Sequence, residues 1–289
     1  PIHLRKTALQ NQREPADMLA RVSTGVGAGI AFSLVIFLPI PGLFITAVAV
    51  LLAFAAKEWA QLCHFQRRAK YAYVAALLVA YCVLIWINQQ STDILLSLIL
   101  LAFSLWLLAI PFLYRYSQSK GLFSNIWLVS VVGTIFMLST SVGLVWLKSL
   151  DDGEWRVVLL VGLVALADTF AFLAGRKFGK HKLAAQISPA KTLEGAYGGL
   201  LANVMLAALF ILAFDYSALS NALLFFLIVG ASAFSVLGDL AESAIKRSSG
   251  VKDSGDLLPG HGGILDRIDG LLAATPFFVL ATLLFSPLS

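Results

Sequence analysis

Long apolar runs separated by short polar segments dominate the chain, and they predict helices that cross a membrane. Most runs reach the roughly 17 to 25 residues that a helix needs to span the hydrocarbon core of a bilayer. The runs are continuously apolar and do not alternate, which argues against a membrane β-barrel. The pattern predicts an all-α polytopic membrane protein with about nine transmembrane helices. The predicted spans cover residues 22–39, 42–57, 71–88, 94–114, 124–147, 156–174, 195–214, 220–245 and 270–286.

The second predicted span, 42–57, is shorter than the others. It follows Pro39-Ile40-Pro41-Gly42, whose prolines and glycine interrupt a helix. A partly re-entrant segment is therefore the alternative to a full crossing at this position.

The composition supports this class of protein, and the basic residues orient it. The 289 residues are 59% hydrophobic with a mean hydropathy of +0.87, which is too apolar for one or two soluble domains. If the N-terminus is cytoplasmic, all of the 21 Lys and Arg residues except Lys148 and Arg156 lie on cytoplasmic segments. The positive-inside rule favours this orientation. The excess of basic residues, which gives a net charge of +5, is then explained by the cytoplasmic segments, so we expect no nucleic-acid partner.

The chain divides into three predicted parts. Residues 1–21 form a cytoplasmic or interfacial N-terminal arm, because its basic residues favour an anionic lipid surface. Residues 22–155 form an N-terminal transmembrane scaffold. Residues 156–289 form the catalytic transmembrane half, because the candidate chemistry lies there.

Ionisable side chains gather between residues 239 and 269. Ten residues of this stretch are Asp, Glu, Lys or Arg, although only 13% of the chain is charged. In this stretch and just before it, polar residues recur every three or four positions, so they share one helix face. They are Ser232, Ser235, Asp239, Glu242, Ser243 and Lys246. Serines alone would satisfy interhelical hydrogen bonds, so the charged members indicate a charged ligand. The topology places this polar site at the cytoplasmic interface.

Two further candidates precede this stretch. Asp168 is predicted roughly 10 Å inside the membrane, about two turns before its helix ends. It should face the bundle interior, with a structural aspartate paired to a lysine as the alternative. Ser188 is predicted to cap a helix that begins at Pro189, which leaves backbone N–H groups beside Lys191 and Thr192. Such a terminus suits phosphate, although a basic loop alone is typical of any cytoplasmic connection.

The loop between residues 252 and 264 is rich in glycine. Gly262 and Gly263 permit a close backbone approach, as a phosphate cradle requires. His261 stands between glycines, and we interpret it as a hydrogen-bond donor to phosphate or a loop-fixing residue in preference to a metal ligand.

Three carboxylates are predicted to share one site. Asp266 and Asp269 lie three residues apart on one helix face, and Asp239 would join them. Carboxylates this close repel unless a cation lies among them, and hard oxygen ligands favour Mg²⁺. Metal-binding carboxylates beside Lys and Arg are typical of phosphoryl or nucleotidyl transfer. The residues alone indicate a membrane enzyme that acts on a phosphorylated lipid or a lipid alcohol.

The charged stretch also carries a long gapped motif. It runs Ser243-x-Ile245-Lys246-Arg247-x4-Lys252-Asp253-x-Gly255-x2-Leu258-Pro259-x-His261-Gly262-Gly263-Ile264-x-Asp266-Arg267-Ile268-Asp269. This motif resembles the signature of the phosphatidate cytidylyltransferase family, also called CDP-diacylglycerol synthases. The segment from Asp168 to Gly195 resembles the same family. The resemblance covers roughly residues 160–289 well, and the first half in span pattern and length only.

The resemblance implies that CTP and phosphatidate react to give CDP-diacylglycerol and pyrophosphate, in phospholipid biosynthesis at a bacterial cytoplasmic (inner) membrane. It implies Mg²⁺, with K⁺ as a candidate second ion, on Asp239, Asp266 and Asp269. Catalytic roles fall on these three aspartates and on Lys246. The expected substrate-binding residues are Asp168, Ser188, Lys191, Thr192, Arg247, Lys252, His261, Gly262, Gly263 and Arg267.

Other protein classes share parts of this pattern. A CTP-dependent polyprenol or phytol kinase has a similar membrane fold and is the main alternative. Asp266-x-x-Asp269-Gly270 begins like the CDP-alcohol phosphotransferase motif, but the Ala-Arg and the later aspartates that should follow are absent. A transporter would need polar residues through the membrane, whereas the first five spans contain no charge at depth. The sequence leaves the choice between a monomer and a homodimer open.

Overall fold

The computed structural model describes residues 32–213, 217–255, 257 and 262–285. The helices and strands follow one another as α2 (Leu43–Leu62), α3 (Arg67–Asn88), α4 (Asp93–Tyr114), α5 (Tyr116–Phe123), α6 (Ile126–Ser149), α7 (Gly153–Phe178), β1 (Lys182–Ala184), β2 (Ser188–Thr192), α8 (Leu193–Ala213), α9 (Ala218–Ser248) and α10 (Leu265–Phe285).

Eight helices of the described part are long and apolar enough to cross a membrane. They are α2, α3, α4, α6, α7, α8, α9 and α10, and they correspond to the second to ninth predicted spans. The prediction of an all-α polytopic membrane protein is confirmed. The first predicted span, 22–39, lies mostly outside the described residues, and the predicted arm, 1–21, lies wholly outside them.

The second span is longer than predicted. Helix α2 has 20 residues, and at about 1.5 Å per residue this length is enough for a full crossing. The expectation of a short segment ending at residue 57 is therefore wrong. The helix continues because Glu58, which looked like the start of a polar loop, is only 4% exposed and has partners inside the protein.

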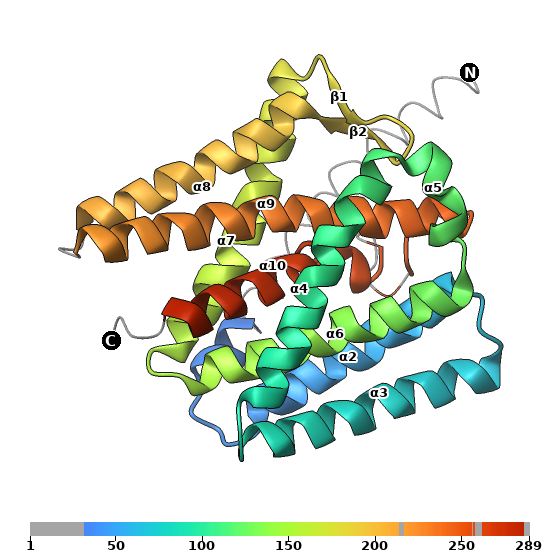
Figure 1. The fold of residues 1–289 in the computed structure, drawn as a ribbon, viewed down its shortest axis with the longest axis horizontal. Coiled ribbons are helices and arrows are strands. Elements are labelled where there is room, and N and C mark those ends of the chain that lie inside the picture. The colour runs from blue at the N-terminus through green and yellow to red at the C-terminus, as the bar shows by residue number, and fades with distance from the viewer. Residues whose placement is uncertain (1–31, 214–216, 256, 258–261, 286–289) are drawn as a thin grey trace, which may run out of the picture.

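Helix α10 lies at the centre of the bundle. In Figure 1 it runs between α8 and α9 above and α2, α3 and α6 below, and it contacts α2, α4, α6, α7 and α9. Most of α6 and α10 is buried, whereas α3, α4 and α8 are largely exposed. The exposed faces carry large apolar side chains such as Trp86 and Met205, which suits contact with lipid.

Two buried polar side chains, Trp106 and Asn203, form hydrogen bonds between helices. The indole Nε1 of Trp106 in α4 donates to the carbonyl of Leu272 in α10 at 3.0 Å. The amide Nδ2 of Asn203 in α8 donates to the carbonyl of Leu163 at 3.0 Å and to Ser232 Oγ at 2.8 Å, which ties α7, α8 and α9 together. An unsatisfied polar group in hydrocarbon is costly, so these bonds fix how the helices pack.

Segments that were predicted to be cytoplasmic meet at one end of the bundle. The end of α9 contacts the end of α2, where Ser249 Oγ donates to the carbonyl of Leu62 at 2.8 Å. It contacts the β1–β2 hairpin, where Arg247 Nε donates to the carbonyl of Ile187 at 3.2 Å. Tyr116 of α5 donates to a backbone carbonyl of α9 at 3.2 Å. The polar connections therefore enclose a single region at that end of the bundle (Figure 1).

The predicted helix start at Ser188 is wrong. Residues Ser188–Thr192 form strand β2, which pairs antiparallel with β1 in the register Lys182–Thr192. Helix α8 begins at Leu193, and Thr192 caps it, because its Oγ1 accepts the N–H of Gly195 at 3.1 Å. Thr is also a preferred N-cap residue, and the strand pairing decides between the two candidates.

Glycines let α7 and α8 approach each other closely. A Cβ atom built on Gly199 of α8 would lie 2.5 Å from the carbonyl oxygen of Ala167 in α7, and one built on Gly195 would lie 2.7 Å from that of Ala171. Small residues of this kind are typical of tight helix packing in membranes. The contact places Asp168, one residue after Ala167, beside α8 and the hairpin.

We predict that Gly199→Ala destabilises the protein by about 1–3 kcal/mol, because the new methyl group forces the two backbones apart. The measurement is the thermal midpoint of the purified protein in one detergent. Gly162→Ala is the matched control, since a Cβ atom on Gly162 of α7 meets nothing within 4 Å. The close packing would be disproved if both variants melted at the wild-type temperature.

Candidate active site

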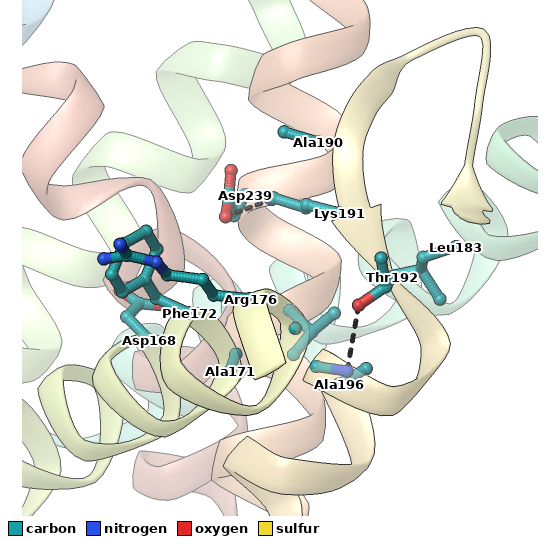
Figure 2. A pocket seen from close by; sticks show the side chains of 13 residues that line it. Asp168, Ala171, Phe172, Arg176, Leu183, Ala190, Lys191, Thr192, Ala196 and Asp239 are labelled. Carbon is teal, nitrogen blue, oxygen red and sulfur yellow. Dashed lines mark hydrogen bonds and ion pairs between the residues drawn. The ribbon is translucent and has the colours of Figure 1, made fainter. Parts of the chain in front are cut away.

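A cavity of about 360 Å³ lies between α7, the β1–β2 hairpin, α8 and α9. Figure 2 shows Asp168, Phe172 and Arg176 of α7 on one side of it. On the other side, Lys191 of β2 reaches toward Asp239 of α9. The cavity therefore brings together four of the predicted site residues, Asp168, Lys191, Thr192 and Asp239, from three separate elements of the chain.

Lys191 and Asp239 form an ion pair across this cavity. Both side chains are only partly exposed, at 25% and 28%, so the pair is shielded from bulk water. Asp168 lies within electrostatic range of both groups. Helix α7 runs to Phe178, so Asp168 lies ten residues from its end, or about 15 Å. This distance to the helix end is longer than the two turns predicted, because the helix continues past residue 174.

Close packing of α9 and α10 brings the next carboxylate to the same region. A Cβ atom on Gly238 would lie 2.3 Å from the carbonyl oxygen of Asp269. Asp269 is 8% exposed, and the carboxylates of Asp239 and Glu242 lie within electrostatic range of it. Gly238 therefore lets α9 and α10 pack closely enough to bring the carboxylates of Asp239 and Asp269 near each other.

Lys246 lies at the centre of a second charged group, which joins α9 to α10 and is less exposed than the Lys191–Asp239 pair. Its Nζ donates to Glu242 Oε2 at 2.6 Å and to Asp266 Oδ1 at 2.5 Å. All three side chains are at most 12% exposed. The predicted catalytic lysine is thus held by two protein carboxylates, and it joins α9 to the first turn of α10.

The glycine loop folds over Asp266. Gly262 has φ of 79°, a left-handed conformation that glycine adopts without strain. The N–H of Gly263 donates to Asp266 Oδ2 at 2.7 Å, and the N–H of Ser254 donates to the same oxygen at 3.1 Å. Gly263 was predicted to help cradle phosphate, and in the structure its N–H binds an internal carboxylate. Of the other residues predicted in this loop, Lys252 is exposed, and His261 lies outside the described residues.

The two predicted arginines lie on different helices and have different partners. Arg247 is exposed at the end of α9 and bonds the hairpin carbonyl of Ile187. Arg267 is exposed on α10 and lies within electrostatic range of Asp168. Arg267 was expected to orient Asp266 or Asp269 or to contact phosphate. The structure adds an electrostatic interaction with Asp168.

Sequence reasoning missed two carboxylates. Glu58 of α2 accepts three hydrogen bonds from the loop before α10 and from the first residue of that helix, although the first five spans were assigned to the scaffold without charge at depth. Glu194 of α8 accepts the backbone N–H groups of Lys180 and His181 at 3.0 and 3.2 Å and contacts His181 Nδ1 at 2.6 Å. A single acidic residue inside an apolar run was the available signal for Glu58.

The carboxylates fit a metal only in part. Among the described residues, no three His, Cys, Asp or Glu side chains are arranged to hold a metal ion together. Asp266 is engaged by Lys246 and by the loop, so it would need to release an oxygen to join a metal site. Asp239 and Asp269 offer hard oxygen ligands, and Mg²⁺ at nucleotide sites often needs only one or two carboxylates plus substrate phosphates.

Comparison with known proteins places this arrangement in a family. The model of the cytidylyltransferase family matches residues 19–285. The chain belongs to this family. The match extends the resemblance found at residues 160–289 through nearly all of the N-terminal half.

Several curated relatives share one name. The chain is similar to a phosphatidate cytidylyltransferase of Pseudomonas aeruginosa, 37% identical over 244 residues, which cover 82% of this chain and 85% of the relative. It is similar to one of Haemophilus influenzae, 34% identical over 262 residues, covering 84% and 91%. A third, from Bacillus subtilis, is 33% identical over 207 residues, covering 63% and 77%.

We predict that Lys246→Met lowers the stability of the protein by about 3–5 kcal/mol, because it leaves two buried carboxylates without their cation. The thermal midpoint in detergent measures this loss. Arg247→Met, at the neighbouring exposed position, should change the midpoint little. Equal midpoints for the two variants would contradict the buried role assigned to Lys246.

Proposed function

We propose that the chain transfers the cytidylyl group of CTP to the phosphate of phosphatidate, giving CDP-diacylglycerol and pyrophosphate. The observation that carries the proposal is the cavity that gathers Asp168, Lys191 and Asp239 at one end of a membrane bundle in a cytidylyltransferase-family chain. Relatives named phosphatidate cytidylyltransferase in several bacteria support the substrate.

This reaction depends more on cations placed around the phosphates than on proton transfer by a side chain. A phosphate monoester has its second pKa near ~6, so the lipid phosphate is largely a dianion at pH 7 and can attack the α-phosphorus directly. The difficulty is that two polyanions must meet. Lys191 and Arg176 line the cavity, Arg247 bonds the carbonyl of Ile187 in the hairpin that borders it, and Lys252 is exposed in the loop after α9. These cations would bind the phosphates and stabilise the charge on the departing pyrophosphate.

The same proposal includes Mg²⁺ held by Asp239 and Asp269. When bound, the ion neutralises charge on the CTP phosphates and makes the α-phosphorus more electrophilic. Lys191 would then exchange its contact with Asp239 for a phosphate oxygen, so the ion pair keeps both groups in place until the substrate arrives. Asp266, which the sequence also assigned to the metal, keeps the loop and Lys246 in position. A K⁺ ion at a second carboxylate site stays part of the proposal.

We propose that the site faces the cytoplasm from the bacterial inner membrane. The segments that the sequence predicts on one side of the membrane carry 19 of the 21 Lys and Arg residues, and the positive-inside rule assigns such segments to the cytoplasm. CTP is present on that side, and phosphatidate can enter from the bilayer because its phosphate lies at the interface.

The proposed reaction predicts which phosphorus of CTP enters the lipid. With CTP labelled on the α-phosphate, the purified protein should incorporate label into the lipid fraction when phosphatidate is supplied. With CTP labelled on the γ-phosphate, label should leave as pyrophosphate. The opposite result, with γ-label in the lipid and a lipid alcohol as acceptor, would identify the alternative, a CTP-dependent lipid kinase.

We further predict that Asp269→Asn lowers cytidylyl transfer by at least about 100-fold, because one of the two proposed metal ligands loses its charge. The protein should still accumulate in the membrane and melt near the wild-type temperature. Asp151→Asn, exposed in the turn before α7, is the control and should keep full activity. Substantial turnover by Asp269→Asn would exclude this aspartate from the metal site.

A further inference from the structure

Glu58 is a buried carboxylate in a helix that contributes nothing to the lining of the catalytic cavity. It lies one turn before the end of α2 and is 4% exposed. Its Oε1 accepts the N–H of Ile264 at 3.0 Å. Its Oε2 accepts the N–H of Leu265 at 2.8 Å and the hydroxyl of Ser254 at 3.0 Å. Each of these donors belongs to the loop before α10 or to the first residue of that helix.

This arrangement is an N-cap supplied from a distant helix. Helix α10 begins at Leu265, and the first N–H groups of a helix have no partner within it. A carboxylate at that end accepts these donors and also interacts favourably with the helix dipole. Glu58 does both from more than 200 residues away in the chain. The N-terminal half thereby holds the start of α10.

The loop is shaped around this carboxylate. A Cβ atom on Gly263 would lie 2.4 Å from Glu58 Oε2, and one on Gly255 would lie 2.7 Å from Glu58 Oε1. Both glycines belong to the family-like motif, and Gly263 was expected to approach phosphate. Their positions here indicate that they make room for Glu58.

The contacts continue from Glu58 to the charged groups of the site. Ser254 joins two carboxylates, because its hydroxyl donates to Glu58 while its N–H donates to Asp266. Asp266 in turn binds Lys246 of α9. Asp269 lies one turn further along α10 from the atoms that Glu58 holds. Movement at the start of α10 would therefore shift both aspartates relative to Asp239.

We propose that Glu58 is a positioning residue for the transfer reaction, which holds the first turn of α10, and with it Asp266 and Asp269, in register with α9. The inference rests on the proposed function for its reaction. Glu58 does not touch the cavity, so its effect passes through the loop and α10. Partners of this kind around a metal site change metal affinity or activity by about 10- to 100-fold when they are removed.

The test compares Glu58→Gln with Trp59→Phe in the full-length protein. Glutamine keeps the size of the side chain but turns an acceptor oxygen into an amide that faces N–H donors. Trp59 is the neighbouring residue, is equally buried, and donates its Nε1 to the carbonyl of Val129 at 3.0 Å on α6, away from the loop. Both variants remove a buried hydrogen bond of α2, and only Glu58→Gln changes the start of α10.

Three quantities separate positioning from simple stabilisation. For Glu58→Gln we expect kcat to fall and the Mg²⁺ concentration for half-maximal activity to rise, together by about 10- to 100-fold. Hydrogen exchange at residues 262–266, followed by mass spectrometry without substrate or metal, should become faster. Trp59→Phe should lower the thermal midpoint while leaving the Mg²⁺ requirement and this exchange as in wild type. The inference is overturned if the two variants behave alike.

If Glu58→Gln does not fold, a second variant tests the inference. Ser254→Ala removes one of the three hydrogen bonds to Glu58, and we expect a smaller rise in the Mg²⁺ requirement in the same direction. Wild-type values for Ser254→Ala would then overturn the inference. Failure of the proposed function has a different signature, since the wild-type protein itself would not transfer the cytidylyl group. Failure of this inference alone leaves an active wild type and an equally active Glu58→Gln.

Discussion

The ion pairs of Lys246 with Glu242 and Asp266 are the interaction on which the arrangement of the site depends. Charged groups in or near a membrane interior are tolerated when they have partners there. Here one ammonium group serves two carboxylates from different helices, at 2.6 and 2.5 Å. The need to satisfy these charges fixes the end of α9 against the start of α10, and the loop between them must follow.

Close packing of the helix backbones brings these charged side chains near one another. Gly238 lets α9 touch the backbone of α10 at Asp269, and Gly199 lets α8 touch α7 beside Asp168. Helices in lipid gain little from hydrophobic burial against one another, so tight contact and interhelical hydrogen bonds must supply their association. The same contacts that hold the bundle together therefore bring carboxylates from α7, α9 and α10 to one end of it.

Several features could be predicted from residues close together in the chain. Hydropathy located the second to ninth spans within about five residues at each end, because each helix satisfies its own backbone in lipid whatever its neighbours are. The polar stripe of α9 followed from helical periodicity, and Ser232, Ser235 and Glu242 are indeed buried. The start of α8 was misplaced, since Ser188 and Thr192 are both good caps and pairing with Lys182 decides between them.

By itself, the sequence determined that this is a polytopic membrane protein of the cytidylyltransferase family with its polar residues in the second half. The tertiary structure decided which of those residues meet. It paired Lys191 with Asp239, turned the glycine loop onto Asp266, and gave Glu58 of the apparent scaffold a place beside the start of α10. These contacts join helices that lie far apart in the chain, and periodicity and spacing describe only one helix or loop at a time.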